Sequence, residues 1–349
     1  MRVGMIAPIA WRVPPRRYGP WERVVSLLTE GLVAAGAEVT LFATADAQTG
    51  ARLSAVVPTP YEETPGMDAK VWESLHLAHA FGGAAGFDLL HNHYDFLPLS
   101  YASLVPTPMV TTIHGFSGER ILPAYRAFDG KTHFVAISDA DRHPALRYLS
   151  TVHHGIPAAE FTFRPEPGGY LLFFGRIHPD KGAADAIRVA RAAGLPLVLA
   201  GLVQDQGYFD REVAPHLSDR VRYVGVAGPA ERDALLGGAL GLLHLIHFDE
   251  PFGLSVVEAM ACGTPVVAFR RGSMPELVEH GISGFLVEDE AAAVAAVAGL
   301  PALPRAGPRA RAEWFSVDRM VAGYLAAYQA MLVPDMTERS SSRLHAGAI

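Results

Sequence analysis

The chain of 349 residues is poor in several features that would point to particular classes of protein. Its single cysteine, Cys262, excludes an intrachain disulfide and fits a reducing compartment. Lys plus Arg total 29 against 36 for Asp plus Glu, and no basic cluster forms the footprint of a nucleic-acid partner. No apolar run approaches the roughly 20 residues that a membrane-spanning helix needs. We therefore expect a cytoplasmic protein without a transmembrane segment, while contact with a membrane surface stays open.

Two nucleotide-binding motifs are also missing from the sequence. Neither the phosphate-loop pattern G-x-x-x-x-G-K-[ST] nor the dinucleotide pattern G-x-G-x-x-G occurs. The opening stretch MRVGMIAPIAWRVPP has too short an apolar run for a signal peptide and is better explained as a first strand. Binding of a nucleoside triphosphate or a dinucleotide therefore loses support.

What the chain does contain is a repeated alternation of short apolar runs and amphipathic helices. RVGMIAPIA precedes a Pro/Gly-rich loop, apolar residues then recur at helical spacing from Trp21 to Leu32, and AEVTLFAT is rich in β-formers. This order is typical of a parallel sheet covered by helices. The pattern breaks at FRPEPGG and restarts at YLLFFGR, so the sequence predicts two α/β domains in tandem.

We place the domain boundaries from this break. One domain spans residues 1–165 and the next spans 166–315. The last amphipathic helix, 316–333, is expected to cross back to the N-terminal domain, and the polar tail 336–349 is expected to be flexible. Runs such as FDLLHNH, PMVTTIH and HFVAIS end in polar residues, and open parallel sheets bind ligands at the carboxyl ends of their strands.

Two glutamates stand close together after a buried run. LGLLHLIHF predicts a strand, DEPFG a turn, and SVVEAMAC a helix that stops at Gly263. Glu250 would project beside the helix N-terminus, which is a natural anion site. Glu258 also fits a capping box with Ser255 as N-cap, and Glu250 could be a solvated loop residue. Both alternatives stay open on local sequence alone.

A second constellation, FFGRIHPDKG, opens the second domain. Arg176 and Lys181 lie five residues apart at a predicted strand-to-helix turn. Such a pair suits a diphosphate, because Arg grips two oxygens and Lys adds a mobile point charge. A pair of surface cations is the alternative. In the first domain, Gly19 would let a loop approach a ligand closely, and His114 stands at a strand end in TTIHGF.

Here the sequence resembles a known family over nearly the whole chain to about Leu332. EPFGLSVVEAMACGTPVVA resembles the glutamate-x7-glutamate signature of retaining family-4 glycosyltransferases, and GRIHPDKG resembles their Arg/Lys diphosphate segment. GSMPELVEHGISGFLV and VVSLLTEGLVAAGAEVTLFAT resemble further segments of the family. The resemblance implies the GT-B architecture, in which two Rossmann-like domains with parallel sheets face each other across an interdomain cleft, the first on the acceptor side and the second binding the nucleotide sugar.

The resemblance also implies roles for individual residues. Glu250 and His114 would act at the donor sugar, and Glu258 would hold the ribose hydroxyls. The other donor-binding residues would be Gly19, Arg176, Lys181, Phe252, Gly253 and Leu254. Two departures affect donor geometry: Gly19-Pro20 stands where many members have two glycines, and His154 replaces the usual Asn in HHGIP.

The implied activity is that of a metal-independent, retaining hexosyl- or pentosyltransferase that uses a nucleotide-diphosphate sugar, such as a UDP or GDP sugar, and no cofactor. The acceptor would be a small or lipid-linked molecule, and bacterial antibiotic biosynthesis and cell-envelope glycan assembly both fit. A sugar-nucleotide epimerase, a phosphorylase, a non-catalytic sugar-nucleotide-binding protein and a glycoside hydrolase are the alternatives. Nucleotide release from candidate donors, with and without acceptor, separates them.

Two motifs resemble metal-binding sites, but a simpler interpretation is available for each. Asp139 to Asp141 match the D-x-D that binds Mn²⁺ in the other glycosyltransferase architecture, but acids in the first turn of a helix after Ser138 are the simpler interpretation. His91 and His93 share one face of a strand without an evident carboxylate or Cys partner. We therefore predict no metal site.

Overall fold

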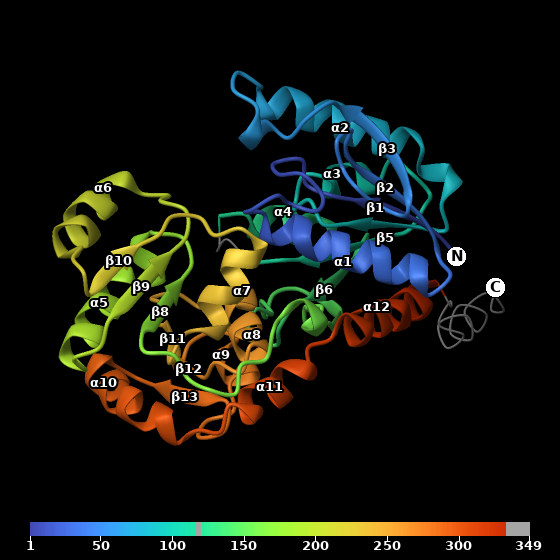
Figure 1. The fold of residues 1–349 in the computed structure, drawn as a ribbon. Coiled ribbons are helices and arrows are strands. Elements are labelled where there is room, and N and C mark those ends of the chain that lie inside the picture. The colour runs from blue at the N-terminus through green and yellow to red at the C-terminus, as the bar shows by residue number, and fades with distance from the viewer. Residues whose placement is uncertain (116–119, 333–349) are drawn as a thin grey trace, which may run out of the picture.

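The computed structural model describes residues 1–115 and 120–332, and these form two α/β halves (Figure 1). Each half contains one sheet in which every strand pair is parallel. The strand orders are β3-β2-β1-β4-β5-β6-β7 and β10-β9-β8-β11-β12-β13. The predicted pair of Rossmann-like α/β units is confirmed. None of the helices within these ranges is long and apolar enough to span a bilayer.

The N-terminal half has seven strands with helices on both faces. Helices α1 and α12 pack on one face, while α2 and α4 contribute to the core on the other. The edge strands β3 and β7 were missed from the sequence, because their residues are mostly half-exposed and form no continuous apolar run. The elements are β1 (Arg2–Ile6), α1 (Pro20–Ala34), β2 (Glu38–Thr44), β3 (Arg52–Val57), α2 (Ala69–Gly82), β4 (Leu89–Asn92), α3 (Leu99–Ala102), β5 (Met109–Ile113), α4 (Leu122–Phe128), β6 (His133–Ala136) and β7 (Tyr148–Thr151).

The C-terminal half repeats the design with six strands. Helix α8 packs into one of its cores, and α5 and α10 pack into the other. The elements are β8 (Leu171–Phe174), α5 (Ala183–Ala192), β9 (Leu197–Ala200), α6 (Gln206–Tyr208), β10 (Val221–Tyr223), α7 (Pro229–Gly237), β11 (Gly241–His244), α8 (Leu254–Ala261), β12 (Val266–Phe269), α9 (Met274–Leu277), β13 (Gly284–Val287), α10 (Glu290–Gly299) and α11 (Ala306–Glu313).

The chain passes between the halves twice, and the two crossings lie side by side. Ile156, in the first crossing, donates its backbone N–H to Phe315 O at 2.9 Å in the second. A Cβ on Gly155 would come within 2.7 Å of the backbone of Val317, which explains why this position has no side chain. Helix α12 (Val317–Leu332) then packs against α1 of the N-terminal half.

The strand orders fix where a ligand can bind. In each sheet the order reverses beside the first strand of its half, between β1 and β4 and between β8 and β11. Ligands of doubly wound sheets bind at such a switch point, outside the carboxyl ends of the strands. In the C-terminal half the chain beyond these ends carries Arg176, after β8, and the turn with Glu250, after β11.

Two local predictions concern the segment after Ser138 and the tail beyond Leu332. The helix expected after Ser138 is wrong: residues 137–141 form bends and turns, and β7 follows at Tyr148. The tail 336–349, expected to be flexible, lies outside the described residues.

Candidate functional site

Arg176 and Lys181 lie at the carboxyl end of β8, next to the switch point. Arg176 lies two residues beyond the end of the strand, after Gly175, and donates a hydrogen bond to Gln204. Lys181 ends the short helical turn Pro179–Lys181, and Gly182 then starts α5 with a left-handed φ of 73°. A Cβ at Gly182 would collide with the backbone of Leu245. The chain thus needs glycine here to bring Lys181 close to the end of β11.

Glu250 is brought against Lys181 by the turn that follows β11. Lys181 Nζ lies 2.5 Å from Glu250 Oε2, and His244 Nε2 lies 3.6 Å from the same oxygen. Burial on its own would raise the pKa of Glu250, but His244 and Lys181 lower it from 4.5 to about 2. Glu250 is therefore an ionised acceptor whose side chain is only 13% exposed, and not a solvated loop residue.

Glu258 does not cap its helix. Helix α8 begins at Leu254, and its N-cap is Gly253, with a φ of 98° and no side-chain cap bond. The predicted alternative with Ser255 as N-cap is wrong, because the glycine turn starts the helix two residues earlier. Glu258 instead lies in the second turn, buried at 4% exposure.

Two arginines from different halves meet the Glu258 carboxylate. Arg232 Nη1 of α7 lies 3.1 Å from Glu258 Oε1, and Arg23 Nε of α1 lies 3.7 Å from the same oxygen. Burial raises the pKa of Glu258, and the two guanidinium groups oppose that rise. Arg23 also donates to Glu160 at 2.9 Å. An N-terminal helix therefore contacts the predicted ribose-binding carboxylate directly.

The backbone of Phe252, Gly253 and Leu254 forms the start of α8. Ser273 Oγ donates to Phe252 O at 2.5 Å and fixes the turn. The free N–H groups of a helix start and the positive end of its dipole favour an anion. This start lies two to four residues beyond Glu250, so carboxylate, lysine and helix N-terminus share one corner of the half.

The N-terminal half contributes the loop that ends at Gly19. Gly19 has a φ of 144°, and a Cβ there would come within 2.9 Å of Pro15 and 3.0 Å of Trp11. The backbone N–H of Trp11 donates a hydrogen bond to Glu22 Oε1 at 3.2 Å. Burial raises the pKa of Glu22 to about 7. Because a Cβ at position 19 would clash with Pro15 and Trp11, glycine is needed for the folding of this loop itself.

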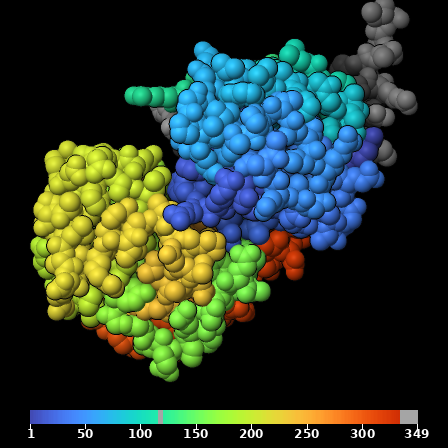
Figure 2. Space-filling model, turned by 45° about the horizontal axis from the view of Figure 1, so that its top comes forward, coloured from blue at the N-terminus to red at the C-terminus, as the bar shows by residue number. Residues whose placement is uncertain are grey.

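Tyr18 shows that this loop faces the C-terminal half. Burial raises the pKa of its hydroxyl, while the charge of Arg176 lowers it and the charges of Glu22 and Glu250 raise it. Figure 2 shows the dark-blue start of the chain against the yellow atoms of the C-terminal half, at the border between the two. Sequence reasoning missed Tyr18, His244, Arg23 and Arg232, since none belongs to a recognisable motif.

His114 belongs to a buried chain of histidines. Its Nε2 lies 2.7 Å from His93 Nδ1, and its Nδ1 lies 3.3 Å from His154 Nε2. Trp21 stacks on its ring at a centroid distance of 5.3 Å. Burial, with smaller effects from His93 and His154, lowers its pKa well below 6.5. The ring is therefore neutral, and both of its nitrogens already have partners.

The chain of histidines continues to the last helix. His93 Nε2 lies 3.2 Å from His91 Nδ1, which is 2.6 Å from the hydroxyl of Tyr328 in α12. At the other end, burial lowers the pKa of His154 to about 3. His91 and His93 thus contact each other, and His91 also contacts α12 through Tyr328. The part of the chain that the structure describes contains no group of three or more His, Cys, Asp or Glu placed to bind a metal.

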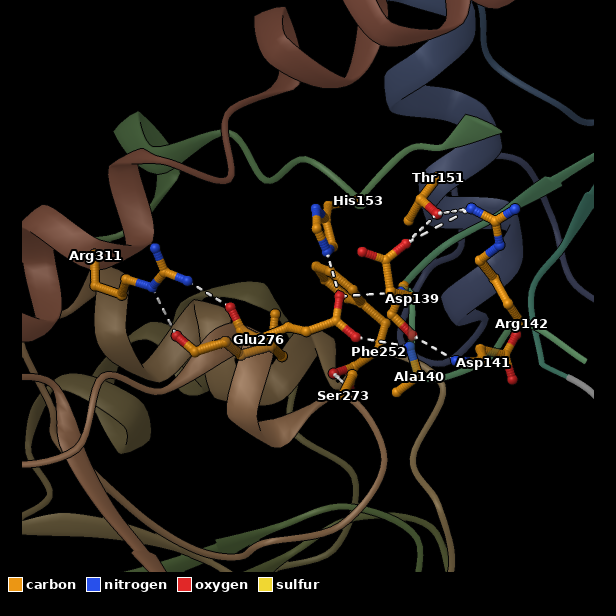
Figure 3. A network of polar contacts seen from close by, with 12 residues as sticks. Asp139, Ala140, Asp141, Arg142, Thr151, His153, Phe252, Ser273, Glu276 and Arg311 are labelled. Carbon is orange, nitrogen blue, oxygen red and sulfur yellow. Dashed lines mark hydrogen bonds and ion pairs between the residues drawn. The ribbon is translucent and has the colours of Figure 1, made fainter. Parts of the chain in front are cut away.

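Asp139 and Ala140 of the D-x-D segment take part in a contact between the halves, drawn in Figure 3. Glu276 of α9 accepts hydrogen bonds from the backbone N–H of Asp139 at 3.0 Å and of Ala140 at 2.8 Å. His153 Nε2 lies 2.8 Å from the same carboxylate. The amides that would have opened the predicted helix are bound by a glutamate of the other half instead.

Cys262 is buried at the end of α8. Burial first, and then Asp233, raise the pKa of its thiol to about 12. It is therefore a small core residue and not a nucleophile.

Comparison with known proteins agrees with this arrangement. Residues 21–164 match the model of Glycosyltransferase Family 4, and residues 159–303 match that of Glycosyl transferases group 1. The D-inositol 3-phosphate glycosyltransferase of Salinispora arenicola is 30% identical over 76% of this chain and 74% of its own length. The glycogen synthase of Mycobacterium tuberculosis is 29% identical over 90% of each chain.

Solved structures share the fold over almost the entire chain. AviGT4, a glycosyltransferase involved in avilamycin A biosynthesis, is 24% identical with a TM-score of 0.72 and covers 96% of this chain and 98% of its own. Anabaena HepE in complex with UDP and glucose is 19% identical with a TM-score of 0.72 and covers 95% of this chain and 100% of its own. The chain belongs to the family-4 glycosyltransferases, with the GT-B architecture.

Proposed function

We propose that this protein transfers a sugar from a nucleotide-diphosphate sugar to an acceptor hydroxyl with retention of anomeric configuration. The observation that carries the proposal is the meeting of Lys181 with Glu250, 2.5 Å apart and with side chains only 14% and 13% exposed, beside the start of α8. A mobile cation, a carboxylate and a helix N-terminus at the switch point suit a diphosphate joined to a polyhydroxy ring.

In this proposal the donor lies along the carboxyl ends of β8 and β11. Arg176, Lys181 and the backbone of Phe252, Gly253 and Leu254 bind the diphosphate, and the loop at Gly19 closes over it from the N-terminal half. Glu250 accepts hydrogen bonds from hydroxyl groups of the donor sugar. Glu258 accepts hydrogen bonds from the ribose hydroxyls. For this, Arg23 has to move away from the Glu258 carboxylate.

The reaction breaks the bond between the sugar's anomeric carbon and the diphosphate oxygen. The electron pair stays on the diphosphate, where Arg176, Lys181 and the start of α8 stabilise the charge. The acceptor hydroxyl attacks the face that the diphosphate leaves and passes its proton to a diphosphate oxygen. The ring of His114 has both nitrogens engaged, so we assign the electrostatic role near the sugar to its backbone carbonyl.

No step in this scheme needs a metal or a bound cofactor, because protein cations neutralise the leaving group. The acceptor class rests on loops without a chemical signature, so a natural product and a cell-envelope precursor are both part of the proposal. The names of relatives add two specific acceptors to try, D-inositol 3-phosphate and glycogen.

The proposal is tested by following nucleotide release from a panel of UDP and GDP sugars, with and without these acceptors. Acceptor-dependent release, with the sugar recovered on the acceptor, is expected. A donor converted to another nucleotide sugar without release would instead identify an epimerase. Tight donor binding with neither outcome, also with natural-product and cell-envelope acceptors, would favour a non-catalytic sugar-nucleotide-binding protein.

A further inference from the structure

His244 is a buried histidine whose Nε2 lies near the carboxylate of Glu250. It ends β11 and is 7% exposed. Its Nε2 has no hydrogen-bond partner among the described residues, and it lies 3.6 Å from Glu250 Oε2. That separation exceeds a hydrogen bond by less than 1 Å. A buried polar atom left without a partner costs free energy, so a state of the molecule that supplies a partner is favoured by the gain of that hydrogen bond.

The oxygen that His244 approaches is already bonded to Lys181. Lys181 Nζ holds Glu250 Oε2 at 2.5 Å, and the same Nζ lies 4.6 Å from the ring centroid of Phe248. Under the proposed function this ammonium group has a second task, since it meets the donor diphosphate. When the ammonium group turns to the phosphate, the Glu250 carboxylate, which is only 13% exposed, would remain ionised without a strong partner, which is costly.

We propose that His244 takes over Glu250 Oε2 when a donor diphosphate draws Lys181 away. This inference rests on the proposed function and adds a positioning residue to it. Nε2 carries the proton in this state and donates to the carboxylate. The exchange keeps Glu250 satisfied and fixed in orientation toward the donor sugar while Lys181 neutralises the leaving group.

The alternative is a core histidine that merely fills space at the end of β11. The two ideas differ in one respect that can be measured. A space-filling role would not depend on the charge of Glu250 or on the presence of a second phosphate. The exchange depends on both, because only a ligand that recruits Lys181 leaves the carboxylate in need of His244.

The test is a double-mutant cycle read by calorimetric titration with UDP and GDP, using whichever the wild type binds more tightly. His244→Leu should weaken binding of the nucleoside diphosphate about tenfold, as expected for one hydrogen bond to a charged group. The same change made in Glu250→Gln should have no effect. The nucleoside monophosphate should bind His244→Leu as it binds the wild type.

Two further variants keep the test sharp. His244→Gln can place an N–H near the position of Nε2 and should restore affinity, whereas His244→Asn is too short and should not; this pair replaces His244→Leu if that variant does not fold. His247→Leu, whose half-exposed ring instead pairs with Asp185 at 3.0 Å, is the matched control and should bind normally.

Each result has a distinct meaning. The exchange is supported if His244→Leu lowers affinity only for the nucleoside diphosphate and only in the protein that keeps Glu250, and if His244→Gln restores that affinity. Wild-type affinity in His244→Leu, or an equal loss in both Glu250 backgrounds, overturns it while leaving the proposed function intact. A wild-type protein that binds neither UDP nor GDP overturns the proposed function and this inference with it.

Discussion

Lys181 and Glu250 are 69 residues apart in the sequence, yet the ammonium nitrogen of one lies 2.5 Å from a carboxylate oxygen of the other. The ends of β8 and β11 bring them together, because these strands are neighbours at the switch point of the C-terminal sheet. The pair is part of the fold before any ligand binds. Donor binding therefore has to redistribute an existing ion pair.

The first prediction concerns the two cations. Arg176→Ala and Lys181→Ala should each weaken donor binding and slow turnover at subsaturating donor by roughly 10- to 100-fold, since each removes a charge-assisted contact of about 1.5–3 kcal/mol. Lys70→Ala, an exposed cation on α2, is the control and should behave as wild type. Unchanged turnover in both site variants would refute the diphosphate assignment.

The second prediction separates the two glutamates. Glu258→Gln should lower affinity for the free nucleotide diphosphate as much as for the sugar donor, because the amide has lost one of the acceptor oxygens offered to ribose. Glu250→Gln should leave free nucleotide binding nearly intact and reduce turnover. Nucleotide titration followed by a transfer assay measures both. Normal nucleotide affinity in Glu258→Gln would leave that residue as only the partner of Arg232 and Arg23.

The third prediction concerns pH and Glu22. Its pKa rises to about 7 in the folded protein, so its contribution to stability is fully present below about pH 4.5 and is lost as pH rises through about 7. Glu22→Gln should match the wild type near pH 4.5 and exceed its free energy of unfolding by up to about 3 kcal/mol at pH 8. Urea unfolding at the two pH values gives the difference. If Glu22→Gln and the wild type differed in free energy of unfolding by the same amount at both pH values, the carboxyl of Glu22 would titrate normally.

Much of this arrangement could be predicted from the sequence where it depends on local pattern. The buried runs before Arg176 and before Glu250 mark strand ends, and glycines and prolines mark the turns. The start of α8 was misplaced because Ser255 fits a capping box, whereas the left-handed Gly253 ends the turn first. Local preference alone does not decide between two such starts.

The contacts that define the site electrostatically were not predictable, because they join distant segments. Arg23 and Glu258 come from different halves, and His244 reaches Glu250 across a turn whose shape no motif specifies. The structure has no helix after Ser138, and the amides of Asp139 and Ala140 are bound by Glu276 of the other half, a contact that the sequence did not predict.

The fourth prediction concerns metals. Transfer activity should survive EDTA, because Arg176, Lys181 and the start of α8 supply the charge that a metal would otherwise provide. The measurement is the initial rate of nucleotide release before and after chelation, with Mn²⁺ and Mg²⁺ added back. Activity that disappears with EDTA and returns with Mn²⁺ would make Asp139 and Asp141, or His91 and His93, candidates for a metal site again.

The central claim is retaining transfer, and the anomeric configuration of the product tests it most directly. The donor that supports acceptor-dependent nucleotide release is incubated with that acceptor, and the new glycosidic linkage is assigned from the proton coupling at the anomeric carbon by NMR. We predict an α-linked product from an α-linked donor, together with one nucleotide diphosphate released for each sugar transferred. A β-linked product from that donor would contradict the account.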